Sequence, residues 1–361
     1  MAIDNDSTAL RTYEVNFGNR HCMTLCRDLD KMKIEDLAKQ IAMKPGKVSA
    51  IIGGPPCQGW SKVGRGKLIS LGKAKEDLLT DPRNFLYRRF IEMITQLKPK
   101  VVVMENVPGM LSIQKMNVAD VVKSNFEDVG YNCRYSLVNA RWFGVPQDRT
   151  RLIFIATRSN PPIETSTLRR YSRFFRKEIA HLSRQMKVAD ALRDLPIIVN
   201  GSDEDPLIYQ RQPGRPSRYV ELMREGSNGL ITDHICRTQN PQDVEAFSTM
   251  KEGMKYYQLD ERFKRYRDDI FRDKYKRLFW NRPSWTVTAH LSKDCYTHIH
   301  PGSPRTISVR EAARLQSFPD NFRFWGNIGD RYRQIGNAVP PLMGWGIAEF
   351  IKQHLVASVK S

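Results

Sequence analysis

Three short apolar runs constrain this chain most, because each is typical of a buried β-strand and helical patterns lie between them. The runs cover residues 48–54 (VSAIIGG), 100–106 (KVVVMEN) and 151–157 (RLIFIAT). They are rich in β-branched residues and are bounded by glycine, proline or charge. Apolar residues at mostly helical spacing predict helices at 84–97 and 117–130. This alternation predicts an α/β fold with right-handed crossovers and a parallel sheet, whose ligands bind beyond the carboxyl ends of the strands.

The pattern changes after residue 158. The following segments are rich in turn residues, and the alternation of strands and helices does not continue. We therefore expect a first domain at 1–158 and a smaller, more irregular domain at 159–324. The remaining segment, 325–361, contains an apolar helical pattern with proline near its start, and we expect it to return to the first domain.

The chain is strongly basic, because 58 Lys and Arg face 39 Asp and Glu, which gives a net charge of +19 and a pI near 9.7. This charge favours a nucleic-acid partner, since cations that neutralise phosphates release counterions. The basic excess is densest at 262–282, where nine Lys and Arg accompany three Asp. A 40% apolar content excludes wholesale disorder, and no apolar stretch approaches the length of a membrane span. The start does not resemble a secretory signal, and six cysteines are too few for a disulfide scaffold, so we expect a reducing, intracellular setting.

A cysteine in a rigid turn is the first candidate for chemistry. Cys57 lies in GGPPCQGWS (53–61), which directly follows a predicted strand. A structural cysteine would normally lie inside an apolar run, whereas a nucleophile needs an accessible, electropositive setting. Spacing alone leaves both interpretations open.

Charged side chains flank two of the predicted strands. The next strand ends in ENVPG (105–109), which places Glu105 beside the cysteine. A lone acid at a strand end is more often a solvated charge or a helix cap, but its position here favours a functional role. Arg149 and Arg151 lie two residues apart where another strand begins, and alternation predicts that they share a face. Their guanidinium groups could bind phosphate or base oxygens, or form an exposed, salt-bridged edge.

Five segments resemble, in order, the signature motifs of the DNA (cytosine-5)-methyltransferase family. They are GGPPCQGWS, KPKVVVMENVPG, QDRTR, RTISVREAARLQSFPDNF and QIGNAVPPLMG, and WTVTAHLSKDCYTHIHP is also similar to the family. The likeness covers 1–158 and about 283 to the end, and the stretch between suits the family's variable target-recognition region. The resemblance implies a Rossmann-like S-adenosylmethionine-dependent methyltransferase fold. It implies a catalytic domain at 1–158, a target-recognition domain at 159–324 and a C-terminal segment at 325–361 that returns to the catalytic domain.

The resemblance also implies a reaction and its residues. The Cys57 thiolate adds to C6 of a cytosine that has been flipped out of double-stranded DNA, and C5 then takes a methyl group from S-adenosylmethionine. Glu105 matches the glutamate that hydrogen-bonds the ring N3 and the exocyclic amine, and Arg151 matches the arginine that binds the base carbonyl. Arg149 matches the second arginine of that family motif, which lies near the thiol and the phosphate. We further expect DNA contacts from Gln58, Ser61, Lys264, Arg265 and Arg267.

The cofactor pocket is only partly matched. The resemblance implies that Asp4 holds the ribose hydroxyls, that Asn5 lies beside the adenine and that Asp28 contacts the adenine amine. Pro55, Asn337 and Val339 complete the matched residues. The family's first strand and Gly-rich turn (Phe-x-Gly-x-Gly-Gly) have no match here. We expect this element upstream of residue 1, on another polypeptide, or lost altogether, and the sequence leaves these alternatives open.

The resemblance therefore implies a DNA-modifying enzyme, and we expect it to belong to a bacterial restriction–modification system and so to be cytoplasmic and nucleoid-associated. The alternatives are an RNA cytosine-5 methyltransferase, a catalytically incomplete DNA-binding fragment or subunit that needs a partner chain, and a cysteine hydrolase. The hydrolase is disfavoured because Cys57 has no matched histidine. We predict packed roles rather than metal binding for His290, Cys295, His298 and His300, because their spacing fits no usual ligand pattern.

Overall fold

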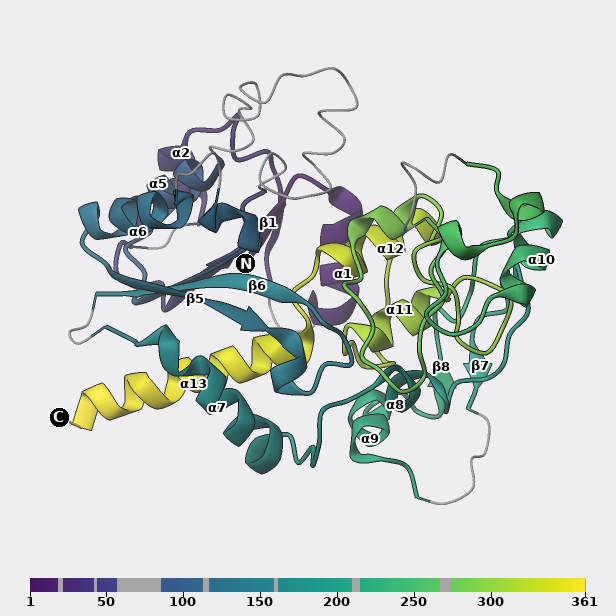
Figure 1. Ribbon diagram of the computed structural model, residues 1–361. Coiled ribbons are helices and arrows are strands. Elements are labelled where there is room, and N and C mark those ends of the chain that lie inside the picture. Colours follow the sequence, from purple (N-terminus) through teal and green to yellow (C-terminus); the bar gives the residue numbers. More distant parts are fainter. Residues whose placement is uncertain are drawn as a thin grey trace. The chain divides into compact units, whose positions relative to one another are not determined.

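The computed structural model describes residues 1–18, 22–41, 44–56, 86–112, 117–158, 162–209, 215–266 and 274–360 (Figure 1). The chain packs into two compact units, each made of segments that are distant in sequence. Unit 1 comprises 1–25, 140–149 and 174–345, and unit 2 comprises 26–139, 150–173 and 346–361. Packing thus groups the first residues and 140–149 with the later half of the chain. The functional boundaries expected after 158 and 324 stay a prediction.

A four-stranded sheet forms the centre of unit 2, in the order β3–β4–β6–β5. Its strands are β3 (Ala50–Gly53), β4 (Val101–Asn106), β5 (Asn132–Asn139) and β6 (Thr150–Thr157). The strands expected at 48–54, 100–106 and 151–157 are therefore confirmed as β3, β4 and β6. Parallel pairing of β3 with β4 brings Gly53 opposite Met104, so that both strands end at the same edge of the sheet.

The expectation of an all-parallel sheet is wrong for β6, which runs antiparallel to both β4 and β5. The sequence pattern did not predict β5, whose buried and exposed residues alternate weakly. Residues 140–149 join β5 to β6 without a crossover α-helix. Parallel neighbours need a crossover of about a dozen residues or more, usually helical, so this shorter link reverses the chain.

Helices cover both faces of this sheet. Figure 1 shows α2 (Ile34–Ile41), α5 (Leu86–Leu97) and α6 (Val118–Asp128) on one side. The other side carries α7 (Leu168–Phe174) and the later part of α13 (Pro341–Lys360), with Tyr171 against Phe350. The helices expected at 84–97 and 117–130 are confirmed as α5 and α6.

Sequence signals account for the ends of these helices. The buried face of α5 repeats at helical spacing and comprises Tyr87, Phe90, Ile91, Met93, Ile94 and Leu97. The Asn117 side chain caps α6 by accepting the N–H of Ala119. Gly130 follows the end of the helix in the left-handed conformation, with a φ of 85°.

Unit 1 is built from short elements. Its helices are α1 (Ser7–Phe17), α8 (Val188–Leu192), α9 (Arg218–Arg224), α10 (Pro241–Thr249), α11 (Val309–Leu315) and α12 (Ile328–Asn337), followed by the first turn of α13. Its strands are β1 (Ala2–Asp4), which pairs with β2 (Thr24–Cys26), and β7 (Leu207–Ile208), which pairs with β8 (Leu230–Ile231). Among the described helices, none is long and apolar enough to cross a membrane.

Single turns complete the described elements. They are η3 (Pro108–Leu111), η4 (Ala140–Phe143), η5 (Thr165–Thr167), the π-helical η6 (Phe175–Ile179), η7 (Tyr256–Gln258), η8 (Glu261–Phe263) and η9 (Ala289–Ser292). Such short turns fit the irregular character expected after residue 158.

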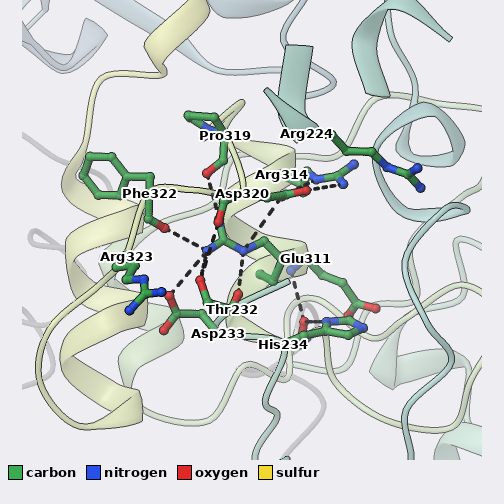
Figure 2. A network of polar contacts seen from close by, with 12 residues as sticks. Arg224, Thr232, Asp233, His234, Glu311, Arg314, Pro319, Asp320, Phe322 and Arg323 are labelled. Carbon is green, nitrogen blue, oxygen red and sulfur yellow. Dashed lines mark hydrogen bonds and ion pairs between the residues drawn. The ribbon is translucent and has the colours of Figure 1, made fainter. Parts of the chain in front are cut away.

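Buried arginines hold the segment from α11 onward in unit 1 (Figure 2). Arg314 lies between two carboxylates, with Nη1 3.1 Å from Asp194 Oδ1 and Nη2 2.6 Å from Asp320 Oδ2. Arg310 donates to the carbonyl oxygens of Thr232, Pro319 and Phe322 at 2.8–3.0 Å. Because a buried charge is tolerated only when it is paired, this network fixes the segments that it joins.

Candidate active site

The ends of β3 and β4 bring a carboxylate beside a glycine–proline turn. Arg151 on β6 reaches the same place, with its Nε 2.7 Å from Glu105 Oε1. These side chains keep 13% and 17% of their area exposed, so the ion pair is largely buried yet accessible. A Cβ on Gly54 would lie 3.3 Å from Glu105 Oε2, which leaves little room for any other residue. The structure thus brings Glu105, Arg151 and the turn together, as the family resemblance implies.

A buried amide ties this turn to β4. Asn106 donates from Nδ2 to the carbonyl of Pro55 at 3.3 Å and accepts the N–H of Val107 at 2.8 Å. On the other side, a Cβ at Gly53 would lie 2.6 Å from the ring of Phe90 on α5, so only glycine fits there. The backbone that leads into Cys57 is therefore held on both sides. Cys57 itself, with Gln58 and Ser61, lies outside the described residues.

Arg149 has a different environment from the one expected. It lies just before β6, so alternation along the strand does not set its direction. Its buried guanidinium, in unit 1, donates to the carbonyls of Val287 at 2.7 Å and Gly336 at 3.1 Å. These carbonyls bind the Arg149 guanidinium, whereas Arg151 pairs with Glu105, and the shared face expected for the two arginines stays a prediction.

The residues expected to hold the cofactor are divided between the units. In unit 1, Asp4 ends β1 and accepts the N–H of Asp6, and Asn5 follows it on the surface. Asn337 ends α12 with an exposed side chain, and Val339 lies two residues further. The helices α1 and α12 are joined by the Thr12 hydroxyl, which donates to Gln334 Oε1 at 2.6 Å. Exposed carboxylate and carboxamide groups are suited to the hydroxyls and amine of a nucleoside, so this donor set fits S-adenosylmethionine.

Unit 2 holds the other two residues expected in the cofactor pocket. Asp28 accepts the N–H of Asp30 at 3.1 Å and has Lys31 3.7 Å away. Pro55 lies in the turn that Asn106 holds. The role of each in cofactor binding stays a prediction.

The predicted phosphate-binding cations are engaged in ion pairs. Lys264 Nζ lies 2.6 Å from Glu261 Oε1. Arg265 Nη2 lies 2.5 Å from Oδ1 of the buried Asp243, which also accepts the hydroxyls of Tyr275 and Tyr296 at 2.5 and 2.6 Å. Arg267 lies outside the described residues. Sequence analysis missed Asp243, because an acid in the first turn after Asn240–Pro241 is an ordinary helix start.

Of the residues considered for a metal site, Cys295, His298 and His300 are buried in unit 1. The side chain of His290 is exposed and only partly shielded by its neighbours, so the packed role expected for it is wrong. Cys295 Sγ donates to the carbonyl of Leu291 at 3.0 Å, and burial raises the pKa of its thiol to about 12. Burial also lowers the pKa of His298 to about 3 and that of His300 to about 4. His290 lies in η9, and burial lowers its pKa too. Among the described residues, no group of these side chains has a geometry that could hold a metal ion.

Comparisons with known proteins identify the family. The family model for C-5 cytosine-specific DNA methylase matches residues 1–353. The chain is 34% identical to the type II methyltransferase M.Bpa9945I of Bacillus paralicheniformis, over 84% of this chain and 70% of that one. It is 32% identical to the type II methyltransferase M.DdeI of Desulfomicrobium norvegicum, over 98% of this chain and 83% of that one.

Solved structures agree with this assignment. An Escherichia coli prophage protein assigned as a DNA modification methyltransferase superposes with a TM-score of 0.71 at 25% identity, covering 98% of this chain and 92% of that one. The Dnmt2 methyltransferase of S. pombe shares the fold alone, with a TM-score of 0.57 at 14% identity over 98% of this chain and 90% of that one. The α/β methyltransferase fold expected from the sequence is thereby confirmed. The chain belongs to the C-5 cytosine-specific DNA methylase family.

Proposed function

We propose that this protein transfers a methyl group to C5 of a flipped-out cytosine in double-stranded DNA, through a covalent adduct on Cys57. We further propose that it is the modification enzyme of a restriction–modification system. The observation that carries the proposal is the Glu105–Arg151 pair beside the turn that leads into Cys57. The type II methyltransferases among its relatives support the choice of DNA.

The paired side chains suit the edge of a cytosine. Glu105 accepts a hydrogen bond from the exocyclic amine and stabilises a proton at N3, while Arg151 donates to the carbonyl oxygen. The Cys57 thiolate forms a bond to C6, and the electrons of the C5–C6 double bond make C5 nucleophilic. S-adenosylmethionine, when bound by Asp4, Asn5, Asp28, Pro55, Asn337 and Val339, supplies the methyl group. Loss of the C5 proton then restores the double bond as the thiolate leaves C6.

A covalent trap tests this proposal. DNA that contains 5-fluorocytosine cannot lose a proton from C5, so the adduct should accumulate on the parent protein and be visible as a shifted band on denaturing gels. Cys57→Ser should form no adduct and should bind DNA within about threefold of the parent, because a serine hydroxyl is a far weaker nucleophile at neutral pH. Adduct formation by the serine variant would contradict the assignment. Faster methylation of RNA than of DNA would favour the RNA alternative.

We also propose that another β-strand, from the same or another polypeptide, pairs with β3. β3 lies at the edge of the described four-stranded sheet, and the side chain of Ile52 on β3 is 77% exposed. Exposed apolar edge strands are normally covered or protected by charge. If Ile52 is covered in the active protein, Ile52→Lys should destabilise folding by about 1–3 kcal/mol, whereas Ile197→Lys at an exposed site in unit 1 should cost about 0.5 kcal/mol or less. Equal, small effects in urea unfolding would show that no strand of this chain covers Ile52 and would leave only a strand from another polypeptide.

A further inference from the structure

Two buried glutamines join four segments of unit 1 that are distant in sequence. Gln147 lies between η4 and β6, Gln316 follows α11, and both side chains are 0% exposed. Their amides contact each other, with Gln147 Nε2 3.0 Å from Gln316 Oε1. Through them, residues around 147, 287, 316 and 335 form one connected set of hydrogen bonds.

The groups at the ends of this set fix the direction of both amides. The N–H of Val287 donates to Gln147 Oε1 at 2.9 Å, so Gln147 must direct Nε2 toward Leu315 O and Gln316 Oε1. Gln316 therefore directs its own Nε2 toward α12, where it donates to Ile335 O at 2.7 Å and Ala338 O at 3.4 Å. A backbone N–H can only donate and a carbonyl can only accept, so neither amide can be turned over without breaking bonds.

Gln316 thus holds the end of α12 from inside the unit, and its neighbours hold the same stretch from other sides. Ser317, at a φ of 62°, accepts the N–H of Leu342 on Oγ at 3.1 Å in the first turn of α13. Arg149 donates to Gly336 O at 3.1 Å. A Cβ on Gly336 would lie 2.1 Å from the backbone nitrogen of Ala289, so α12 touches η9 directly there. The backbone on both sides of Asn337 is therefore fixed, although the Asn337 side chain is itself exposed.

We infer that Gln316, oriented by Gln147, is a positioning residue for the loop from Asn337 to Pro340, and that it sets where Asn337 and Val339 meet S-adenosylmethionine. The inference rests on the proposed function, in which these two residues contact the cofactor. Gln316 acts only through the carbonyls of Ile335 and Ala338. Small displacements of a positioned group are costly for binding and catalysis, so a residue of this kind can matter without touching the ligand.

Gln316→Met tests the inference, because methionine keeps the length of the side chain and removes the amide. We expect faster amide hydrogen exchange over 335–342 in the cofactor-free protein. We also expect calorimetry with S-adenosylhomocysteine to give a Kd raised about 10- to 100-fold, as for one or two hydrogen bonds, and DNA affinity within about threefold of the parent. Gln147→Met should act in the same direction and more weakly, and it serves as the second variant if Gln316→Met fails to fold.

Gln239→Met is the matched control. Gln239 is another buried glutamine of unit 1, and its Nε2 donates to Thr306 Oγ1 at 3.2 Å and Arg237 O at 3.4 Å. Gln239→Met should lower the melting temperature by about as much as Gln316→Met does. Amide hydrogen exchange over 335–342 and the Kd for S-adenosylhomocysteine should stay within about twofold of the parent. Equal effects of the Gln239 and Gln316 variants, or unchanged exchange over 335–342 in Gln316→Met, would overturn the inference.

A further variant separates this inference from the proposed function. If Asn337→Ala binds S-adenosylhomocysteine as tightly as the parent, or if the parent does not bind it, the proposed cofactor site fails and the inference fails with it. If Asn337→Ala weakens binding and Gln316→Met does not, the inference alone is overturned.

Discussion

At the scale of single residues, the chemistry depends on how Glu105 and Arg151 hold each other. The 2.7 Å contact orients a carboxylate and a guanidinium toward the same strand end, one offering acceptors and the other donors. Because both are largely shielded from water, their interaction with a bound base is stronger than it would be on an open surface.

Glu105→Gln should reduce the single-turnover rate of methyl transfer by about 10²–10³-fold, because the amide keeps the shape of the side chain and loses its charge in the transition state. DNA affinity should change by less than about threefold, since the residue lies beside one base rather than along the phosphates. Glu127→Gln is the control, because Glu127 also forms an ion pair in unit 2, with Lys123 at 2.7 Å, on an exposed face of α6. A rate for Glu105→Gln close to that of the control would rule out the proposed role.

The sequence can predict the contacts of a residue only when its partners lie nearby in the chain or belong to a motif that already pairs them. The meeting of Glu105 and Arg151 follows from the family resemblance, in which both contact one base, and not from the strand pattern. An all-parallel sheet would place the end of one strand and the start of the other at opposite edges, and it is the antiparallel pairing of β6 with β4 that brings them together. The carbonyls that enclose Arg149 are 138 and 187 residues away along the chain, and no periodicity links them. The orientation of Gln316 depends in the same way on Gln147, 169 residues distant.

At the scale of elements, α11 is held by buried charge rather than by an aliphatic face alone. Arg314 pairs with Asp194 and Asp320, and Arg305 contacts Glu311 at 2.7 Å with both terminal nitrogens. Burial by itself would raise the pKa of Glu311, but Arg305 and His300 lower it well below its usual value. The pair with Asp194 joins α11 to a segment 120 residues away.

Arg314→Met should destabilise the protein by about 3 kcal/mol, because it removes the buried cation that Asp194 and Asp320 share. Among the described cations, Asp194 then keeps only Arg224, at 2.9 Å, and the fully buried Asp320 keeps only Arg310, at 3.9 Å. Urea unfolding followed by circular dichroism measures this. Asp320→Asn combined with Arg314→Met should recover part of the loss, since the more weakly paired of the two carboxylates is then neutral. If the single variant costs under 1 kcal/mol, the network does not hold α11.

Elements with strong periodicity could be predicted from the sequence, and elements made by distant contacts could not. The helices α5, α6 and α13 bury continuous apolar faces, and the patterns that indicated them are local. The two-residue strands β7 and β8 depend on each other and on neighbouring bonds such as that of the Asp233 N–H to Asp205. The antiparallel direction of β6 follows from the short link after β5, which the pattern did not reveal.

At the scale of the whole molecule, the net charge of +19 predicts strong, salt-dependent DNA binding. The structure changes which of the cations we expect to contact the DNA phosphates. Arg262 on η8 is 66% exposed, whereas Arg265 is paired with the buried Asp243. The sequence alone treats the two as equal members of one basic stretch.

Arg262→Ala should weaken binding to all DNA sequences alike and reduce the slope of log K against log salt by about one. Arg265→Ala should instead lower the melting temperature, because it leaves the Asp243 carboxylate buried with only its tyrosine partners among the described side chains. Fluorescence anisotropy at several salt concentrations and thermal unfolding distinguish the two. An unchanged melting temperature for Arg265→Ala, with a reduced salt slope, would restore it as a phosphate contact.

Buried histidines also link the stability of the whole protein to pH. Burial lowers the pKa of His300 to about 4 and that of His298 to about 3, whereas in the unfolded chain both titrate near 6.5. Between these values the unfolded chain binds more protons, so the stabilisation is complete above pH 6.5 and is lost as the pH falls toward 4, by up to about 1.4 kcal/mol per pH unit for each histidine. Urea unfolding between pH 7.5 and 5 should show this decline in the free energy of unfolding. His300→Gln should reduce the slope of that free energy against pH by about the contribution of one histidine. His181→Gln, at an exposed site, should leave the slope unchanged. An undiminished slope in His300→Gln would show that other groups carry the pH dependence.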